Sequence, residues 1–199
     1  MCLLFESIKV INGEMLCVDY HNQRINRARH QLLDQTEPWD LRTMIKMPEL
    51  PSNQVYKCKI VYANEIFNID FQPYTIKPLQ TLKLVECPDL TYNHKYLDRS
   101  HLELLKSSNS QTDDIIIVKH EFLTDCSFAN IVFFDNEKWI TPSTPLLKGT
   151  KRQKYIDNQT VVEDEIKLSD LKFFSKARII NAMINLEESR DILPENIFK

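Results

Sequence analysis

Glycine is scarce in this chain of 199 residues, with only Gly13 and Gly149 present. Glycine is used where the backbone needs a positive φ or must approach another group closely, so each position carries information. Gly13 follows Asn12 between two apolar segments, which predicts the tight turn of a β-hairpin. Gly149 lies outside any such turn signature and therefore needs another explanation.

Paired cysteines and metal-ligand spacings are also missing. The five cysteines are odd in number and include no C-x-x-C pair, and the five histidines fall outside the spacing of zinc ligands. These absences disfavour a disulfide framework and a metal site. We therefore expect reduced thiols in a cytoplasmic protein.

Neither a basic excess nor a long apolar run is present. The formal net charge is -3, with 27% charged and 43% hydrophobic residues, which is ordinary for a soluble globular protein. A nucleic-acid-binding surface would need clustered basic residues, and a membrane span would need about 18 apolar residues in succession. The N-terminal sequence MCLLFESIKV also lacks the pattern of a signal peptide. We expect no nucleic-acid partner and no membrane partner.

The apolar periodicity predicts a mixed α+β chain with a domain boundary near Cys87, giving domains 1–86 and 87–199. In the first domain we predict hairpins over residues 3–19 and 54–71, a helix over 22–33 and a strand over 81–86. In the second we predict strands over 114–119, 128–134, 138–141, 161–168 and 177–183. Helices are predicted there over residues 98–107, from Gly149 to 155, and over 170–174.

Four short strings occur in one order along the chain. They are F-E-S-x-K-V-x-N-G with Y-H-N-Q-R-I, then H-K-Y-L-D-R, then T-D-C-S-F-A-N-I, and then I-T-P-S-T-P-L-L-K-G-T-K-R; a weaker fifth string is I-I-N-A-M. This succession resembles the class IV aminotransferases, which include branched-chain and D-amino-acid aminotransferases and 4-amino-4-deoxychorismate lyase. The resemblance implies the two-domain α+β architecture of D-amino-acid aminotransferase (fold type IV), shortened at both ends, with pyridoxal 5′-phosphate as cofactor.

The resemblance implies two catalytic residues. Lys95 lies at the position of the family lysine, whose primary amine must bond to the cofactor aldehyde and can later move a proton. Asp125 lies where relatives carry the glutamate beside the pyridine nitrogen, which a carboxylate within about 4–6 Å keeps protonated. The alternatives are a solvated lysine at a helix start and an ordinary turn aspartate.

The resemblance also implies a phosphate site. Gly149-Thr150-Lys151 is similar to the family string G-I-T-R, and the N–H groups of Thr150 and Lys151 at a helix N-terminus are the expected donors. Lys151 stands where the family has threonine. Arg24 matches the family arginine that binds the phosphate through two N–H groups. Asn181 lies where relatives complete the cofactor pocket.

Arg99 bears on the reaction. It follows Lys95 at the fourth position, as in the K-x-L-N-R string of 4-amino-4-deoxychorismate lyases, whereas branched-chain aminotransferases have a tyrosine at the position of Ser100. The resemblance therefore favours a lyase that releases pyruvate and forms p-aminobenzoate for folate synthesis, with Arg99 near the substrate. The alternatives are an amino-acid aminotransferase of the branched-chain or D-amino-acid type, or a cofactor-binding protein without turnover.

The remaining expectations concern partners and two conspicuous polar residues. Family members form homodimers, so a small amino substrate and a second copy of the chain are the expected partners. His21 and Asn130 belong to the quoted strings, but we interpret both as mainly structural.

Overall fold

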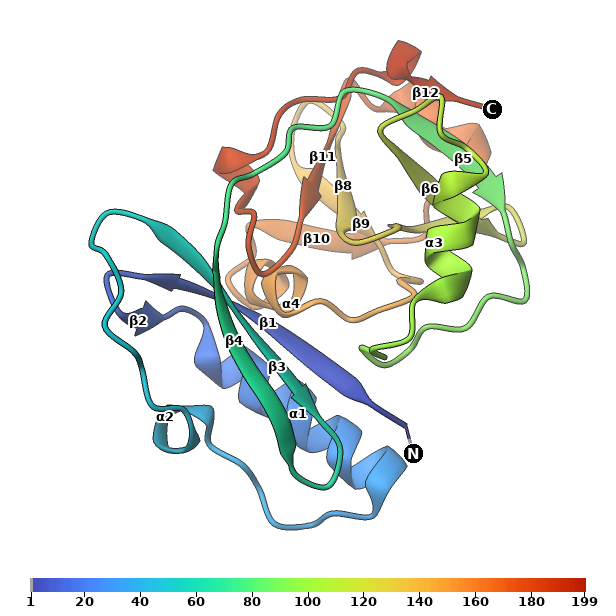
Figure 1. The fold of residues 1–199 in the computed structure, drawn as a ribbon. Coiled ribbons are helices and arrows are strands. Elements are labelled where there is room, and N and C mark those ends of the chain that lie inside the picture. The colour runs from blue at the N-terminus through green and yellow to red at the C-terminus, as the bar shows by residue number, and fades with distance from the viewer. Residues whose placement is uncertain (1) are drawn as a thin grey trace. The chain divides into compact units, whose positions relative to one another are not determined.

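The computed structural model describes residues 2–199, which form two compact units (Figure 1). One unit comprises the chain up to Ile76 together with His94–Asp98, and the other comprises Lys77–Asn93 and Arg99–Lys199. The boundary expected at residue 87 would leave strand β5 (Leu82–Glu86) in the first unit. In the structure β5 belongs to the second unit, because it pairs in parallel with β6 (Asp114–Lys119).

The first unit is an antiparallel sheet with the strand order β2–β1–β3–β4 and one long helix packed on it. Asn12 and Gly13 both have positive φ, as the predicted tight turn between β1 and β2 requires. Leu4, Ile8 and Val10 of β1 are buried with Ile25 and Ala28 of the helix in one core. The elements are β1 (Leu4–Ile11), β2 (Glu14–Met15), α1 (Val18–Leu33), α2 (Leu41–Met44), β3 (Val55–Tyr62) and β4 (Ile66–Pro73).

The strand predicted over residues 14–19 is wrong beyond Met15, and α1 begins four residues earlier than predicted. Cys17 is the N-cap of α1 and has a left-handed backbone, with φ 57° and ψ 33°. This conformation turns the chain directly from the hairpin into the helix. Left-handed backbone is uncommon for residues other than glycine, asparagine and aspartate, so a cysteine at this position does not indicate it.

The second unit contains an eight-stranded sheet with the order β10–β9–β8–β7–β6–β5–β12, in which β11 also pairs with β8. Strand β7 was not predicted, because its last four residues are all buried and no polar alternation marks it. The strands predicted over residues 161–168 and 177–183 end earlier than expected. The remaining elements are α3 (Ser100–Ser107), β7 (Phe122–Cys126), β8 (Asn130–Phe134), β9 (Trp139–Pro142), α4 (Thr150–Asp157), β10 (Val161–Asp164), η1 (Leu168–Phe173), β11 (Lys176–Ile180), η2 (Leu186–Glu188), η3 (Pro194–Asn196) and β12 (Ile197–Phe198).

Three further features bear on the class of protein. Within residues 2–199 no helix is long and apolar enough to cross a membrane. The same part of the chain holds no group of three or more His, Cys, Asp or Glu side chains arranged to hold a metal ion. All five cysteines are free thiols.

Candidate active site

Lys95 lies on a short extended segment that joins the sheet of the first unit beside β1. The N–H of Phe5 donates to the Lys95 carbonyl at 2.9 Å, and the N–H of Leu97 donates to the Leu3 carbonyl at 2.9 Å. The Lys95 ammonium lies 4.5 Å from the centroid of the Phe5 ring, within the range of a cation–π contact. The boundary expected at residue 87 would put Lys95 in the C-terminal domain, whereas this backbone pairing puts it in the first unit.

Glu6 follows Phe5 and is a fully buried carboxylate in the first unit. Arg24 of α1 donates from Nε to Glu6 Oε1 at 2.9 Å and from Nη2 to Glu6 Oε2 at 2.6 Å. His21, one turn earlier on α1, places Nδ1 2.6 Å from Glu6 Oε2. The three side chains are at most 8% exposed, and we call them the Glu6 triad.

The protonation of the Glu6 triad follows from its surroundings. Burial alone would raise the pKa of Glu6, but the charge of Arg24 and the hydrogen bond from His21 outweigh it and lower that pKa to about 2. Burial lowers the pKa of His21, so the imidazole is neutral at neutral pH and its Nδ1–H donates to the carboxylate. Arg24 therefore carries a charge that Glu6 balances. Two of its five guanidinium N–H donors serve this pair.

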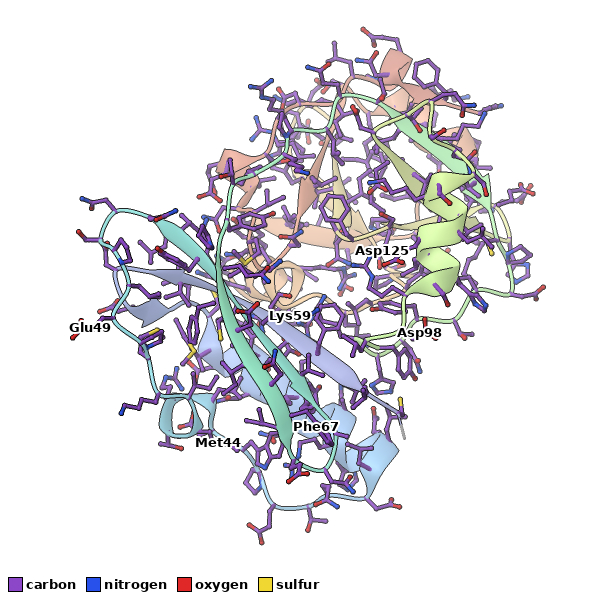
Figure 2. All side chains as sticks on the ribbon, viewed as in Figure 1. Met44, Glu49, Lys59, Phe67, Asp98 and Asp125 are labelled. Carbon is purple, nitrogen blue, oxygen red and sulfur yellow. The ribbon has the colours of Figure 1, made fainter. Side chains whose placement is uncertain are left out.

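Asp125, labelled in Figure 2, is the fourth residue of β7 in the second unit, and its carboxylate accepts hydrogen bonds from a side chain and from the backbone. It is paired with Asn130 across the tight turn between β7 and β8, and Asn130 Nδ2 donates to Asp125 Oδ1 at 2.7 Å. The N–H of Leu147 donates to Asp125 Oδ2 at 2.9 Å. The carboxylate is therefore fixed both from β8 and from the loop that precedes α4.

The pKa of Asp125 indicates whether its carboxylate suits the pyridine nitrogen of pyridoxal phosphate. Burial raises this pKa to about 6, although hydrogen bonds from Leu147 and Asn130 and the charge of Arg152 lower it. The protein thus stabilises the carboxylate less well than water does. A cation against the carboxylate would lower its pKa again, and a protonated pyridine nitrogen is such a cation. The chemistry of Asp125 therefore fits the cofactor.

Gly149 is the N-cap of α4. Its φ is -70°, so a positive φ is not what requires glycine there. A Cβ at this position would lie 2.0 Å from Asn130 Oδ1, which makes close packing against Asn130 the reason for glycine.

The first turn of α4 contains Thr150 and Lys151, which are 3% and 4% exposed. Lys151 Nζ donates to Asn185 Oδ1 at 2.5 Å. This turn contains no acidic residue, so the positive end of the helix dipole receives no carboxylate from its own helix. The predicted phosphate loop therefore has the polarity that an anion needs.

Arg99 and Asn181 both contact the turn that carries Asp125. Arg99 Nη2 donates to the Ser127 carbonyl at 2.6 Å, and its buried Nε has no hydrogen-bond partner among residues 2–199. Asn181 Nδ2 donates to the Phe128 carbonyl at 3.5 Å, and its Oδ1 accepts two backbone N–H groups of the turn that follows. Both predicted residues therefore brace the turn between β7 and β8.

The structure groups the predicted residues within each unit. The first unit holds Lys95 and Arg24, and the charge of Lys95 contributes to lowering the pKa of His21. The second unit brings Asp125 and Gly149 together through Asn130. The sequence strings contained Glu6, His21 and Asn130, but gave none of them a role toward the site.

A cavity of about 490 Å³ in the second unit is distinct from these contacts. It is lined by Leu90, Thr91, Tyr92, Asn93, Lys119, His120, Phe122, Thr124, Thr144, Pro145 and Leu146. No predicted site residue is among them. We therefore do not include this cavity in the candidate site.

Comparison with known proteins gives concordant results. The sequence profile of the family described as amino-transferase class IV matches residues 3–187. An uncharacterized protein of Haemophilus influenzae is 34% identical over 185 residues, which cover 92% of this chain and 98% of that protein. A "putative aminodeoxychorismate lyase" of Schizosaccharomyces pombe is 30% identical over 108 residues, which cover 50% of this chain and 46% of that protein. The crystal structure of a "putative 4-amino-4-deoxychorismate lyase" from Haemophilus somnus 129pt has a TM-score of 0.85 at 31% identity, covering 94% of this chain and 98% of that one. These likenesses confirm the fold expected from the sequence strings.

Proposed function

Since the chain belongs to the class IV aminotransferase family, whose members depend on pyridoxal phosphate, we propose that it is a pyridoxal-phosphate lyase acting on 4-amino-4-deoxychorismate. The main support for the cofactor proposal is the buried carboxylate of Asp125. Burial raises the pKa of this carboxyl group, and a cationic partner would stabilise its charged form. The substrate proposal is supported by Arg99 at the lyase position and by the likeness to the Haemophilus somnus protein over nearly the whole chain.

Each part of the cofactor has a proposed protein partner. Lys95 supplies the amine that bonds covalently to the cofactor aldehyde, and Asp125 pairs with the ring nitrogen. Arg24 and the N-terminal turn of α4, with Thr150 and Lys151, bind the phosphate, and Gly149 lets that turn pack closely. Asn181 completes the pocket through the turn it braces. When bound, pyridoxal phosphate supplies an electron sink for the carbon attached to the substrate nitrogen.

Lys95 is the proposed general acid–base residue of the chain. With cofactor and substrate bound, the amine of Lys95 would take the proton from the ring carbon that bears the amino group. The carbon–oxygen bond to the enolpyruvyl group then breaks, and the departing oxygen keeps the bonding electrons. The released three-carbon fragment takes up one proton and becomes pyruvate. The ring becomes aromatic as p-aminobenzoate, so the two products contain all atoms of the substrate.

The covalent attachment site can be tested directly. Borohydride reduction of the protein loaded with pyridoxal phosphate is expected to label Lys95, as found by peptide mapping. Lys59 offers a matched control, because its ammonium lies 5.5 Å from the centroid of the same Phe5 ring. Lys95→Ala should lose the label, whereas Lys59→Ala should keep it. A label on another lysine would overturn the assignment of Lys95.

The reaction type is tested by measuring products. With 4-amino-4-deoxychorismate the protein is expected to release pyruvate over many turnovers without a keto-acid acceptor, and Arg99→Leu should reduce this release more than it reduces cofactor affinity. An aminotransferase would instead convert its cofactor stoichiometrically to pyridoxamine phosphate when mixed with an amino acid alone. Such conversion with L- or D-amino acids, together with no pyruvate release, would replace the lyase proposal by the aminotransferase one.

A further inference from the structure

We infer that Asn130 is a positioning residue, which fixes the Asp125 carboxylate and the glycine at the N-terminus of α4 in one arrangement. The inference deepens the proposed function and rests on it, because Asp125 and this helix end are the proposed partners of the cofactor ring and phosphate. Asn130 itself acts only through these neighbours.

The hydrogen bonds of Asn130 support this role. Its Nδ2 group has two donors, and they reach Asp125 Oδ1 at 2.7 Å and the Leu147 carbonyl at 2.9 Å. The N–H of the same Leu147 donates to Asp125 Oδ2 at 2.9 Å. The peptide of Leu147 is therefore bound through both its N–H and its carbonyl. The three bonds close a ring that joins β7, β8 and the loop before α4.

Asn130 also packs against Gly149 at the N-terminus of α4. A Cβ on Gly149 would lie 2.0 Å from Asn130 Oδ1 and 3.2 Å from its Cγ, whereas the next nearest atom, Arg152 Cβ, would be 3.7 Å away. Asn130 is thus the group that would clash with a side chain at position 149. Its amide occupies the space between the carboxylate and the first turn of α4.

Asparagine fits these contacts because its side chain has a group with two N–H donors. Two acceptors, a carboxylate oxygen and a carbonyl oxygen, face its Nδ2 group, so an aspartate at 130 would present oxygen to oxygen. A serine has one donor and a leucine has none. Removal of Asn130 takes away one of the hydrogen bonds that lower the pKa of Asp125.

The test is a double-mutant cycle on Asn130→Ala and Gly149→Ala, measured as pyridoxal-phosphate affinity, thermal stability and the Asp125 pKa of the cofactor-free protein by carboxyl ¹³C NMR. Gly149→Ala alone should weaken cofactor binding by roughly tenfold or more, equivalent to ~1.4 kcal/mol. Once Asn130 is alanine, adding Gly149→Ala should have little further effect, because its clashing partner is gone. Asn130→Ala should also raise the Asp125 pKa, since it removes a hydrogen bond to the carboxylate.

Asn26 provides the control, because its side chain also makes two hydrogen bonds, both to the backbone of Trp39 in the first unit. Asn26→Ala should lower stability while leaving the Asp125 pKa unchanged. Additive effects of the two substitutions, or an Asp125 pKa that does not rise in Asn130→Ala, would overturn the inference. Failure of the unaltered protein to bind pyridoxal phosphate would instead overturn the proposed function, while the stability cycle and the NMR titration would still decide the role of Asn130.

Discussion

Arg24→Ala is expected to lower the free energy of unfolding by about 3–5 kcal/mol, as is usual when one partner of a buried ion pair is removed. The reason is that Glu6 has no solvent exposure and would keep only His21 of the two partners in its triad. Chemical denaturation at neutral pH measures the loss. The same variant should also weaken pyridoxal-phosphate binding, so stability and affinity must be separated.

The double variant Glu6→Leu with Arg24→Met makes that separation. Replacing a buried ion pair by apolar residues of similar volume is often neutral or stabilising, but His21 Nδ1–H loses its acceptor, which costs about 1–3 kcal/mol, so we expect stability between that of Arg24→Ala and that of the unaltered protein. Cofactor affinity should stay low, because the guanidinium that binds the phosphate is absent. Restored affinity in this folded variant would show that Arg24 acts only through the fold and does not bind phosphate.

The pH dependence of the Arg24→Ala defect has a definite sign. The pairing lowers the pKa of Glu6 from its ordinary value of 4.5 to about 2 in the folded chain. A carboxylate with a lowered folded-state pKa contributes stability that is present above pH 4.5 and is lost as the pH falls toward 2. The stability difference between Arg24→Ala and the unaltered protein should therefore be largest above pH 4.5 and shrink below it. A difference that grows on acidification would contradict the ion-pair explanation.

Asp125→Asn is expected to retain bound cofactor but to lose turnover by about a hundredfold or more. Without the carboxylate, a fall of two units in the pKa of the ring nitrogen would lower its protonated fraction by about that factor at neutral pH. Asp125→Glu is the matched control, because it keeps the negative charge. It should recover part of the turnover that Asp125→Asn loses. Turnover of Asp125→Asn within a fewfold of the unaltered protein would remove Asp125 from the mechanism.

Asp125 should also affect how the cofactor affinity depends on pH. Since the pKa of Asp125 is about 6 in the cofactor-free chain, a protonated ring binds best once the pH has risen above that value. The affinity of the unaltered protein should therefore rise through pH 6 more steeply than that of Asp125→Asn. Ionisation of the cofactor phosphate occurs in the same range but affects both proteins alike, so the difference between them isolates Asp125.

The sequence predicted well those parts that depend on neighbours along the chain. The turn at Asn12-Gly13 and the helix after Gly149 have local signatures, and both formed at the expected residues. Glu6 could not be interpreted in this way, because the partner that makes its burial favourable lies 18 residues away on α1. Strand β7 carries no alternation since its last four residues are all buried, so only its partners in the sheet identify it.

Gly149 shows how a correct position can have a different explanation. Its isolation in a chain of two glycines indicated a close approach, and the family resemblance suggested the phosphate as the approaching group. The structure shows that a side chain of the protein itself, Asn130, already requires the glycine. That contact joins β8 to the start of α4 and therefore could not be recognised without the fold.

The segment His94–Asp98 makes the chain return to the first unit. The backbone passes from the first unit to the second after Ile76, returns for five residues beside β1, and leaves again after Asp98. The first unit is thus incomplete until the ribosome has made residue 98, although most of its sheet is encoded before residue 74. A single protease cut between residues 77 and 81 would break the covalent link after the first unit. The returning segment would still be hydrogen-bonded to that unit through the backbone of Leu3 and Phe5. Any scheme that expresses the two units as separate polypeptides, split after Ile76, would place Lys95 on the wrong fragment.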